Sequence, residues 1–69
     1  MDIDLIADNL IKIRKKHKLK RSDLGKLINY AQSSVWNYEN KVCEPKLCYI
    51  YRISKQFNIS IDDILNKKL

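Results

Sequence analysis

The chain of 69 residues contains one glycine, one proline and two cysteines. So little glycine and proline, beside abundant leucine and isoleucine, predicts an all-helical fold. Cys43 and Cys48 are too few for the disulfide scaffold of a small secreted domain, so we expect reduced thiols and a cytoplasmic protein. The N-terminal segment MDIDLIADN has no basic residue, so we expect that it is not a signal peptide. No apolar run approaches the roughly 20 residues of a transmembrane span, so we expect no membrane partner.

The sequence also lacks the motifs of common enzymes. It has no glycine-rich phosphate loop, no nucleophile motif and no cluster of metal-binding carboxylates. Cys43, Cys48 and His17 would need a fourth ligand to hold zinc, and their spacing fits no common zinc finger. We therefore expect neither catalysis nor a metal or other cofactor.

The charge balance is strongly basic, with a formal net charge of +6. Half of the basic side chains lie in residues 12–21, KIRKKHKLKR, which hold seven lysines and arginines. Such an excess points to an anionic partner, of which nucleic acid is the first candidate. The alternative is that the run forms only a solvated face.

Apolar periodicity predicts five helices, over residues 4–17, 21–28, 32–40, 46–57 and 61–67. Asp2 or Asp4 is expected to cap the first helix, and Ser60 with Asp63 resembles a capping box for the last. In the fourth, a stripe of Leu47, Ile50, Tyr51, Ser54 and Phe57 is expected. The connections are short, which predicts one domain over residues 1–69 with a single core. The expected core residues are Leu10, Ile13, Leu19, Leu24, Ile28, Val35, Tyr38, Ile50, Ile53, Phe57, Ile59, Ile64 and Leu65.

The segment LGKLINYAQSSVWNYENK, residues 24–41, predicts a helix-turn-helix. Gly25 interrupts an apolar helical pattern, where glycine costs about 1 kcal/mol relative to alanine, so we expect a second helix to pass close to it. Asn29 tolerates the positive φ that a sharp turn requires. Val35 can pack inward from the second helix of the motif, which is the helix that enters the DNA major groove.

With Val35 and Tyr38 inward, helical periodicity turns a polar face outward. That face carries Gln32, Ser33, Trp36, Asn37 and Asn40 and no acidic residue. Asn and Gln can bind adenine through two hydrogen bonds, Ser is permissive, and Trp36 can press on a thymine methyl group or a sugar. The alternatives are a solvated face and, for Trp36, packing against Tyr30.

Phosphate contacts are expected where the basic run meets the start of the second helix, since helix N-termini attract phosphate. Lys20 and Arg21 lie there, and Lys41 with the backbone of Asn40 lies at the far end of the third helix. These contacts supply affinity that depends on salt concentration, and they do not discriminate between DNA sequences.

Several segments in order resemble the Cro-like, phage-repressor family of helix-turn-helix proteins, also called the xenobiotic-response-element type. They are residues 10–14 (LIKIR), 24–29 (LGKLIN), 35–39 (VWNYE), Pro45 and 59–65 (ISIDDIL). The resemblance covers about four-fifths of the chain. It implies a compact five-helix, lambda-repressor-like fold and a homodimer that binds a pseudo-palindromic operator in double-stranded DNA.

By position, the resemblance also implies residue roles. Gln32, Ser33 and Asn37 would read bases, with Ser34 and Asn40 nearer the backbone. Arg14 would form a structural ion pair with Glu39. The chain departs from the family pattern at several positions. Arg21 replaces a common glutamine, and Lys20 and Ala31 replace Ser or Thr caps. Asn29 and Lys41 replace glycines, and Tyr30 and Tyr38 are bulkier than usual.

We expect the dimer contact near the C-terminal helices, at Tyr49, Ile61 and Leu69, with Tyr49 on the outer side of its helix. A lone domain of this size suits a phage repressor, a restriction–modification controller or an antitoxin. The rival interpretation is a protein-interaction module on the same fold, such as a toxin-binding antitoxin. RNA binding is weaker, because Trp36 and Tyr49 are the only candidates for base stacking.

Overall fold

The computed structural model describes residues 2–69, and their regular structure consists of five helices. These are α1 (Ile3–Lys16), α2 (Arg21–Ile28), α3 (Gln32–Glu39), α4 (Leu47–Phe57) and α5 (Ile61–Asn66). The predicted all-helical class is confirmed, and each predicted boundary lies within one residue of the observed one. None of the helices within residues 2–69 combines the length and apolar character that crossing a membrane requires.

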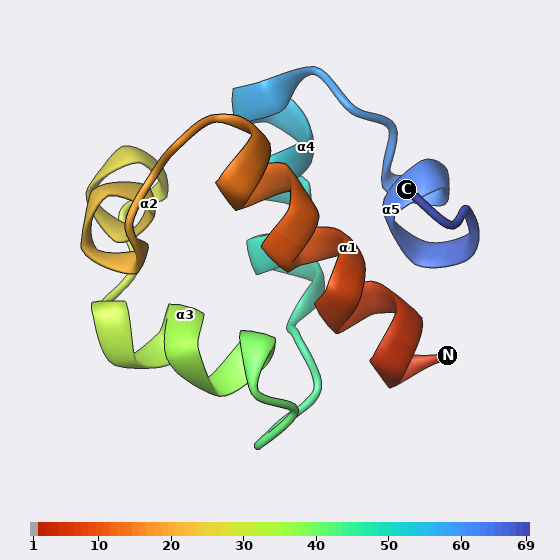
Figure 1. The fold of residues 1–69 in the computed structure, drawn as a ribbon, viewed down its shortest axis with the longest axis horizontal. Coiled ribbons are helices and arrows are strands. Elements are labelled where there is room, and N and C mark those ends of the chain that lie inside the picture. The colour runs from red at the N-terminus through yellow and green to blue at the C-terminus, as the bar shows by residue number, and fades with distance from the viewer. Residues whose placement is uncertain (1) are drawn as a thin grey trace.

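The helices enclose one core, with α1 crossing the middle of the fold (Figure 1). It contacts α3 on one side and α5 on the other, while α2 packs against α3 and α4. Every residue of the predicted core is buried or half-buried. Ile6, Ala7 and Tyr49 are also fully buried. The core therefore forms through contacts between helices, since none of them is long enough to be stable alone.

The helix starts are capped unequally. The Asp2 carboxylate accepts a hydrogen bond from the Leu5 backbone at 3.1 Å, and Ser60 Oγ accepts one from Asp63 N at 3.0 Å. At the start of α2, the carboxylate of Asp23 reaches back to Lys20 N at 3.1 Å. The N-cap of α3, Ala31, has no side-chain oxygen to offer. The position of α3 consequently depends on tertiary packing.

Two asparagines end their helices in the left-handed conformation. Asn29 has φ 60° at the end of α2, and Asn58 has φ 54° at the end of α4. Asparagine tolerates this region better than most residues. The predicted positive φ at Asn29 is confirmed. Lys41, at the other position where the resemblance implies a glycine, adopts φ 62° after α3.

The expected outer position of Tyr49 is wrong. Its side chain is 0% exposed, and its ring packs edge-on against Tyr30 and tilted against Tyr38, with centroids 5.0 and 4.5 Å apart. The inward face of α4 consists of Tyr49, Ile50 and Ile53, so Leu47 and Tyr51 of the predicted stripe are exposed instead. Both stripes have helical spacing. The rings of Tyr30, in the turn between α2 and α3, and of Tyr38, on α3, decide which stripe is buried. Tyr49 is therefore not available as a dimer contact.

A buried asparagine, which the sequence did not single out, fastens the C-terminal segment to α1. Asn9 is 0% exposed, and its Nδ2 donates to the carbonyl oxygens of Ile64 at 2.9 Å and Lys67 at 2.7 Å. Its Oδ1 accepts from the backbone N–H of Leu69 at 3.1 Å. Three hydrogen bonds to backbone groups satisfy most of the capacity of one buried amide. They fix residues 67–69 beside α1.

Candidate nucleic-acid interface

The turn between α2 and α3 has no room for a side chain at Gly25. A Cβ atom built there would lie 2.5 Å from the carbonyl oxygen of Tyr30. The nearest group is thus the turn itself, and the backbone nitrogen of Gln32, where α3 begins, follows at 3.6 Å. The expected close approach of a second helix to Gly25 is therefore seen at the start of α3. Tyr30 N donates to Gly25 O at 2.8 Å, which closes the turn behind the left-handed Asn29. Glycine at position 25 allows α3 to leave α2 at a sharp angle.

An arginine from α4 caps the same turn. Arg52 Nη1 donates to the carbonyl oxygens of Ile28 at 3.1 Å and Asn29 at 3.3 Å, which would otherwise end α2 without partners. Its guanidinium also lies 5.0 Å from the centroid of the Tyr30 ring, within range of a cation–π interaction. Sequence reasoning missed Arg52 because its partners are 23 and 24 residues away.

The two faces of α3 differ in composition. Val35, Tyr38 and Glu39 are buried against the rest of the fold. The opposite face presents polar side chains and one indole, with Trp36 46% exposed. Of the predicted DNA-contacting residues on α3 and its end, those exposed are Gln32, Ser33, Trp36 and Asn40, and those half-buried are Ser34 and Asn37. Asn40 Nδ2 donates to the Trp36 carbonyl at 2.9 Å, so that amide closes the end of the helix.

A buried carboxylate binds α3 to the first two helices. Glu39 is 3% exposed, and both of its oxygens accept hydrogen bonds from Arg14, at 2.8 Å from Nε and 3.0 Å from Nη2. Arg14 Nη1 donates to the Leu19 carbonyl at 2.9 Å. Arg21, at the start of α2, adds a further bond from its Nε to Glu39 Oε1 at 3.0 Å. One carboxylate therefore connects α1, α2 and α3 and sets the angle at which α3 projects.

A family model described as helix-turn-helix matches residues 10–64. The chain belongs to the XRE-type helix-turn-helix family. No curated protein and no solved structure matches it. The XRE-type family consists of DNA-binding regulators of transcription that are generally not enzymes, so this chain is a DNA-binding regulator of that type.

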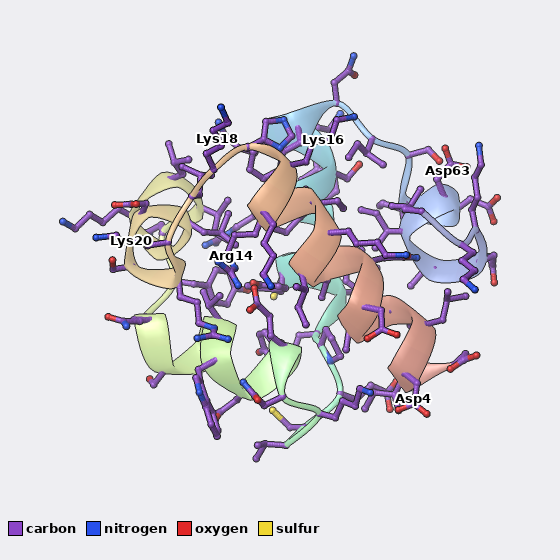
Figure 2. The ribbon with its side chains drawn as sticks, viewed as in Figure 1. Asp4, Arg14, Lys16, Lys18, Lys20 and Asp63 are labelled. Carbon is purple, nitrogen blue, oxygen red and sulfur yellow. The ribbon has the colours of Figure 1, made fainter. Side chains whose placement is uncertain are left out.

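The predicted phosphate-contacting residues of this XRE-type chain lie in different surroundings. Lys20 is exposed immediately before α2, whereas the side chain of Arg21 is 37% exposed with its Nε bound to Glu39. Lys41 Nζ lies 3.3 Å from Asp4 Oδ1 in an exposed ion pair. Figure 2 shows Lys16 and Lys18 at the edge of the fold far from α3, with Lys20 beside α2. The basic run therefore divides into two groups. Lys20 and Arg21 lie at the start of α2, whereas Lys16 and Lys18 lie far from α3.

The tyrosines behind the turn are held in unusual surroundings. Tyr30 OH lies 2.8 Å from Cys48 Sγ, and this contact raises the pKa of Tyr30 and lowers that of Cys48. Burial raises the pKa of Tyr38 and, more strongly, that of Tyr49. Tyr49 OH is buried without a hydrogen-bond partner among residues 2–69. The Tyr49 hydroxyl thus adds nothing to the network that holds α3.

Proposed function

We propose that this XRE-type regulator is a repressor that binds a pseudo-palindromic operator as a homodimer in the cytoplasm, with α3 in the major groove. The observation that carries the proposal is the exposed face of α3. Gln32, Ser33 and Trp36 project from it, and no acidic residue lies on it. A groove lined with base donors and acceptors suits such a face.

The proposed division of roles follows from chemistry and position. Gln32 and Asn37 can each form two hydrogen bonds with adenine, Ser33 can bind several bases, and Trp36 can press on a thymine methyl group or a sugar. The proposed phosphate contacts are Lys20, Arg21, Ser34, Asn40 and Lys41. Arg21 would bind phosphate through its Nη groups, because its Nε is bound to Glu39. Such an arginine would link the DNA backbone to the buried carboxylate.

The proposed dimer contact involves the C-terminal helix and the residues after it. Ile61 is half-buried at the start of α5, and Leu69 is 41% exposed. If these side chains belong to one exposed apolar patch, that patch would favour association with a second copy. Two copies joined this way would place their α3 helices in successive major grooves, about 10 base pairs apart.

Binding selection from a random pool of 30-base-pair duplexes at physiological salt tests the proposal. Enrichment of a two-fold symmetric sequence with half-sites about 10 base pairs apart would support it. Retention of DNA without enrichment, falling steeply with salt, would show that charge alone attracts DNA and would contradict the proposal. Enrichment of a single half-site would contradict the proposed homodimer but would still support the reading of bases by α3.

A second candidate function is protein binding on the same fold, as in a toxin-binding antitoxin. The observation that favours it is an apolar pair outside the α3 face, Leu27 on α2 and Tyr51 on α4, which are 48% and 50% exposed. They line a shared hollow with Arg52 and Lys55. Replacing Leu27 and Tyr51 with serine should leave DNA selection unchanged if that surface serves a protein partner.

A further inference from the structure

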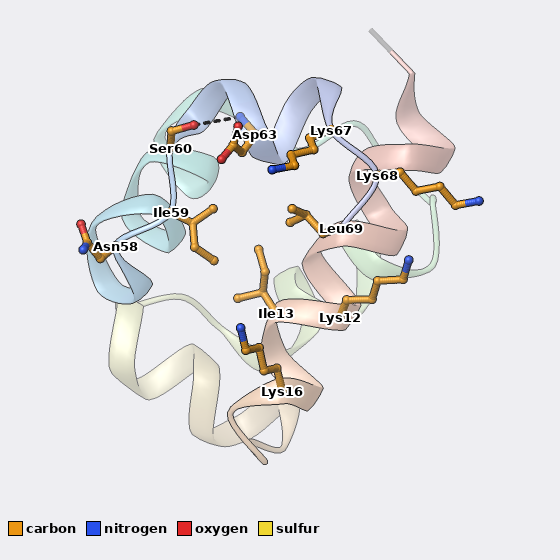
Figure 3. Close-up of a pocket in the computed structure, with 10 residues that line it drawn as sticks. All are labelled: Lys12, Ile13, Lys16, Asn58, Ile59, Ser60, Asp63, Lys67, Lys68 and Leu69. Atoms are coloured by element: carbon orange, nitrogen blue, oxygen red, sulfur yellow. Dashed lines mark hydrogen bonds between the residues drawn. The ribbon is translucent and has the colours of Figure 1, made fainter.

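A hollow of about 490 Å³ lies between α1 and the C-terminal segment (Figure 3). Its lining combines two kinds of side chain. Ile13, Ile59 and Leu69 point toward its centre from three different segments of the chain, and they form an apolar floor. Lys16 from α1 and Lys67 from the C-terminal segment extend their amino groups over that floor from opposite sides. The volume is within the range of small-molecule sites.

The charge of the rim is one-sided. Lys12 and Lys68 also line the hollow, but their amino groups point away from its centre, and the single acidic residue of the lining is Asp63. Among residues 2–69, none of these lysines lies within ion-pair distance of a carboxylate. The amino groups of Lys16 and Lys67, against one aspartate, leave a positive rim above an apolar floor.

One wall of the hollow is held in place by the core. Lys67 and Leu69 belong to the segment that the fully buried Asn9 fastens to α1, through its bonds to Lys67 O and Leu69 N. The opposite wall is α1 itself, where Ile13 is 4% exposed. Both walls are therefore fixed before anything binds, which lowers the entropic cost of binding.

We propose that this hollow binds a small organic anion with an apolar body, such as a carboxylate on a hydrocarbon chain. The anionic group would lie between the amino groups of Lys16 and Lys67, and the hydrocarbon would cover Ile13, Ile59 and Leu69. Charge alone would suit any anion, nucleic acid included. The apolar floor favours a ligand that also removes hydrocarbon from water.

The site is separate from the DNA interface. Lys16 lies at the edge of the fold far from α3, so an anion there does not compete with DNA on the α3 face (Figure 2). Leu69 belongs both to the hollow and to the proposed dimer contact, so the ligand would bind beside the surface that joins two copies. The inference rests on the geometry of the hollow and does not require operator binding.

Titration of the isotopically labelled protein with octanoate, followed by amide NMR shifts, tests the proposal. We expect saturable shifts at the amides around Ile13, Ile59 and residues 67–69. Acetate carries the charge without the hydrocarbon, and 1-octanol carries the hydrocarbon without the charge. Each should bind at least about tenfold more weakly, because each lacks one of the two interactions.

A pair of variants with equal charge makes the test specific. Lys16→Gln combined with Lys67→Gln should raise the Kd for octanoate about tenfold, the loss of roughly one charge-assisted hydrogen bond. Lys26→Gln combined with Lys46→Gln removes the same charge outside the hollow and should leave the Kd unchanged. Equal effects of the two pairs, or octanoate shifts spread over all lysine-rich segments, would overturn the proposal. Equal affinity for acetate and octanoate would overturn it as well.

Discussion

The guanidinium of Arg14 on α1 binds both oxygens of the Glu39 carboxylate at the end of α3, at 2.8 and 3.0 Å. This pair lies inside the fold, where a charge without its partner is costly. Because Arg21 binds the same carboxylate, Glu39 balances two cations from two other helices. The orientation of α3 consequently depends on one side chain at its end.

Glu39→Gln should lower the free energy of unfolding by about 3–5 kcal/mol, because it leaves buried Arg14 without its counter-charge. Urea denaturation measures this change. The control is Lys41→Gln, which breaks the exposed pair with Asp4 and should cost at most about 1 kcal/mol. Similar losses in the two variants would contradict a structural role for the buried pair.

Gly25→Ala should destabilise the fold by about 1–3 kcal/mol, because the new Cβ would lie 2.5 Å from the Tyr30 carbonyl oxygen and the turn must shift. Alanine favours helices over glycine, so an unhindered site would instead be stabilised. Lys26→Ala, on the next and exposed residue of the same helix, should change stability by less than about 0.5 kcal/mol. A stabilised Gly25→Ala variant would show that the turn has room.

Asn9→Ala should release the C-terminal segment from α1, because it removes all three hydrogen bonds between the Asn9 side chain and the backbone of that segment. The Leu69 amide, which donates to Asn9 Oδ1, should exchange its hydrogen faster. Stability should fall by about 1–3 kcal/mol. Asn66→Ala, which removes only an exposed bond to Asp62, is the control and should leave the exchange of Leu69 unchanged.

Tyr49→Phe should keep or raise stability at neutral pH, by up to about 1 kcal/mol, because the buried hydroxyl has no partner within residues 2–69. Burial raises the pKa of Tyr49 above its ordinary value of 10.0, so the fold favours the neutral hydroxyl. Above pH 10 the tyrosine of the unfolded chain ionises while Tyr49 in the fold stays neutral. The free energy of unfolding is therefore unaffected by this group below pH 10 and falls as the pH rises above it.

The advantage of Tyr49→Phe should accordingly grow by about 1 kcal/mol between pH 10 and pH 11. Denaturation of both proteins across that range measures it. Tyr51→Phe, at an exposed site on the same helix, is the control. A destabilised Tyr49→Phe variant at neutral pH would contradict the prediction that the hydroxyl contributes no hydrogen bond to the fold.

Asn37→Ala or Gln32→Ala should weaken binding to the selected operator by about 1–3 kcal/mol and leave binding to random DNA unchanged. Lys20→Ala should weaken both and reduce the salt slope by about 1. Lys16→Ala removes the same charge far from α3 and is the matched control (Figure 2). Equal losses on operator and random DNA for Asn37→Ala would contradict its base-reading role.

The sequence by itself determined the helices, the turn at Asn29 and most of the core. These features depend on local patterns: apolar spacing along a helix, a side chain that tolerates positive φ, and capping residues such as Ser60. Each signal lies within a few residues of the structure that it predicts. The family resemblance rests on the same segments, so the sequence predicts both the fold class and the family.

Only the tertiary structure decided which face of α4 is buried, because two stripes on that helix have helical spacing. The rings of Tyr30 and Tyr38 select the stripe that contains Tyr49. The same holds for the Asn9 contacts, which join residues 55 to 60 positions apart. Periodicity says which residues share a face of one helix, but not which distant groups meet that face. That choice depends on packing between helices, and it also created the lysine-rimmed hollow.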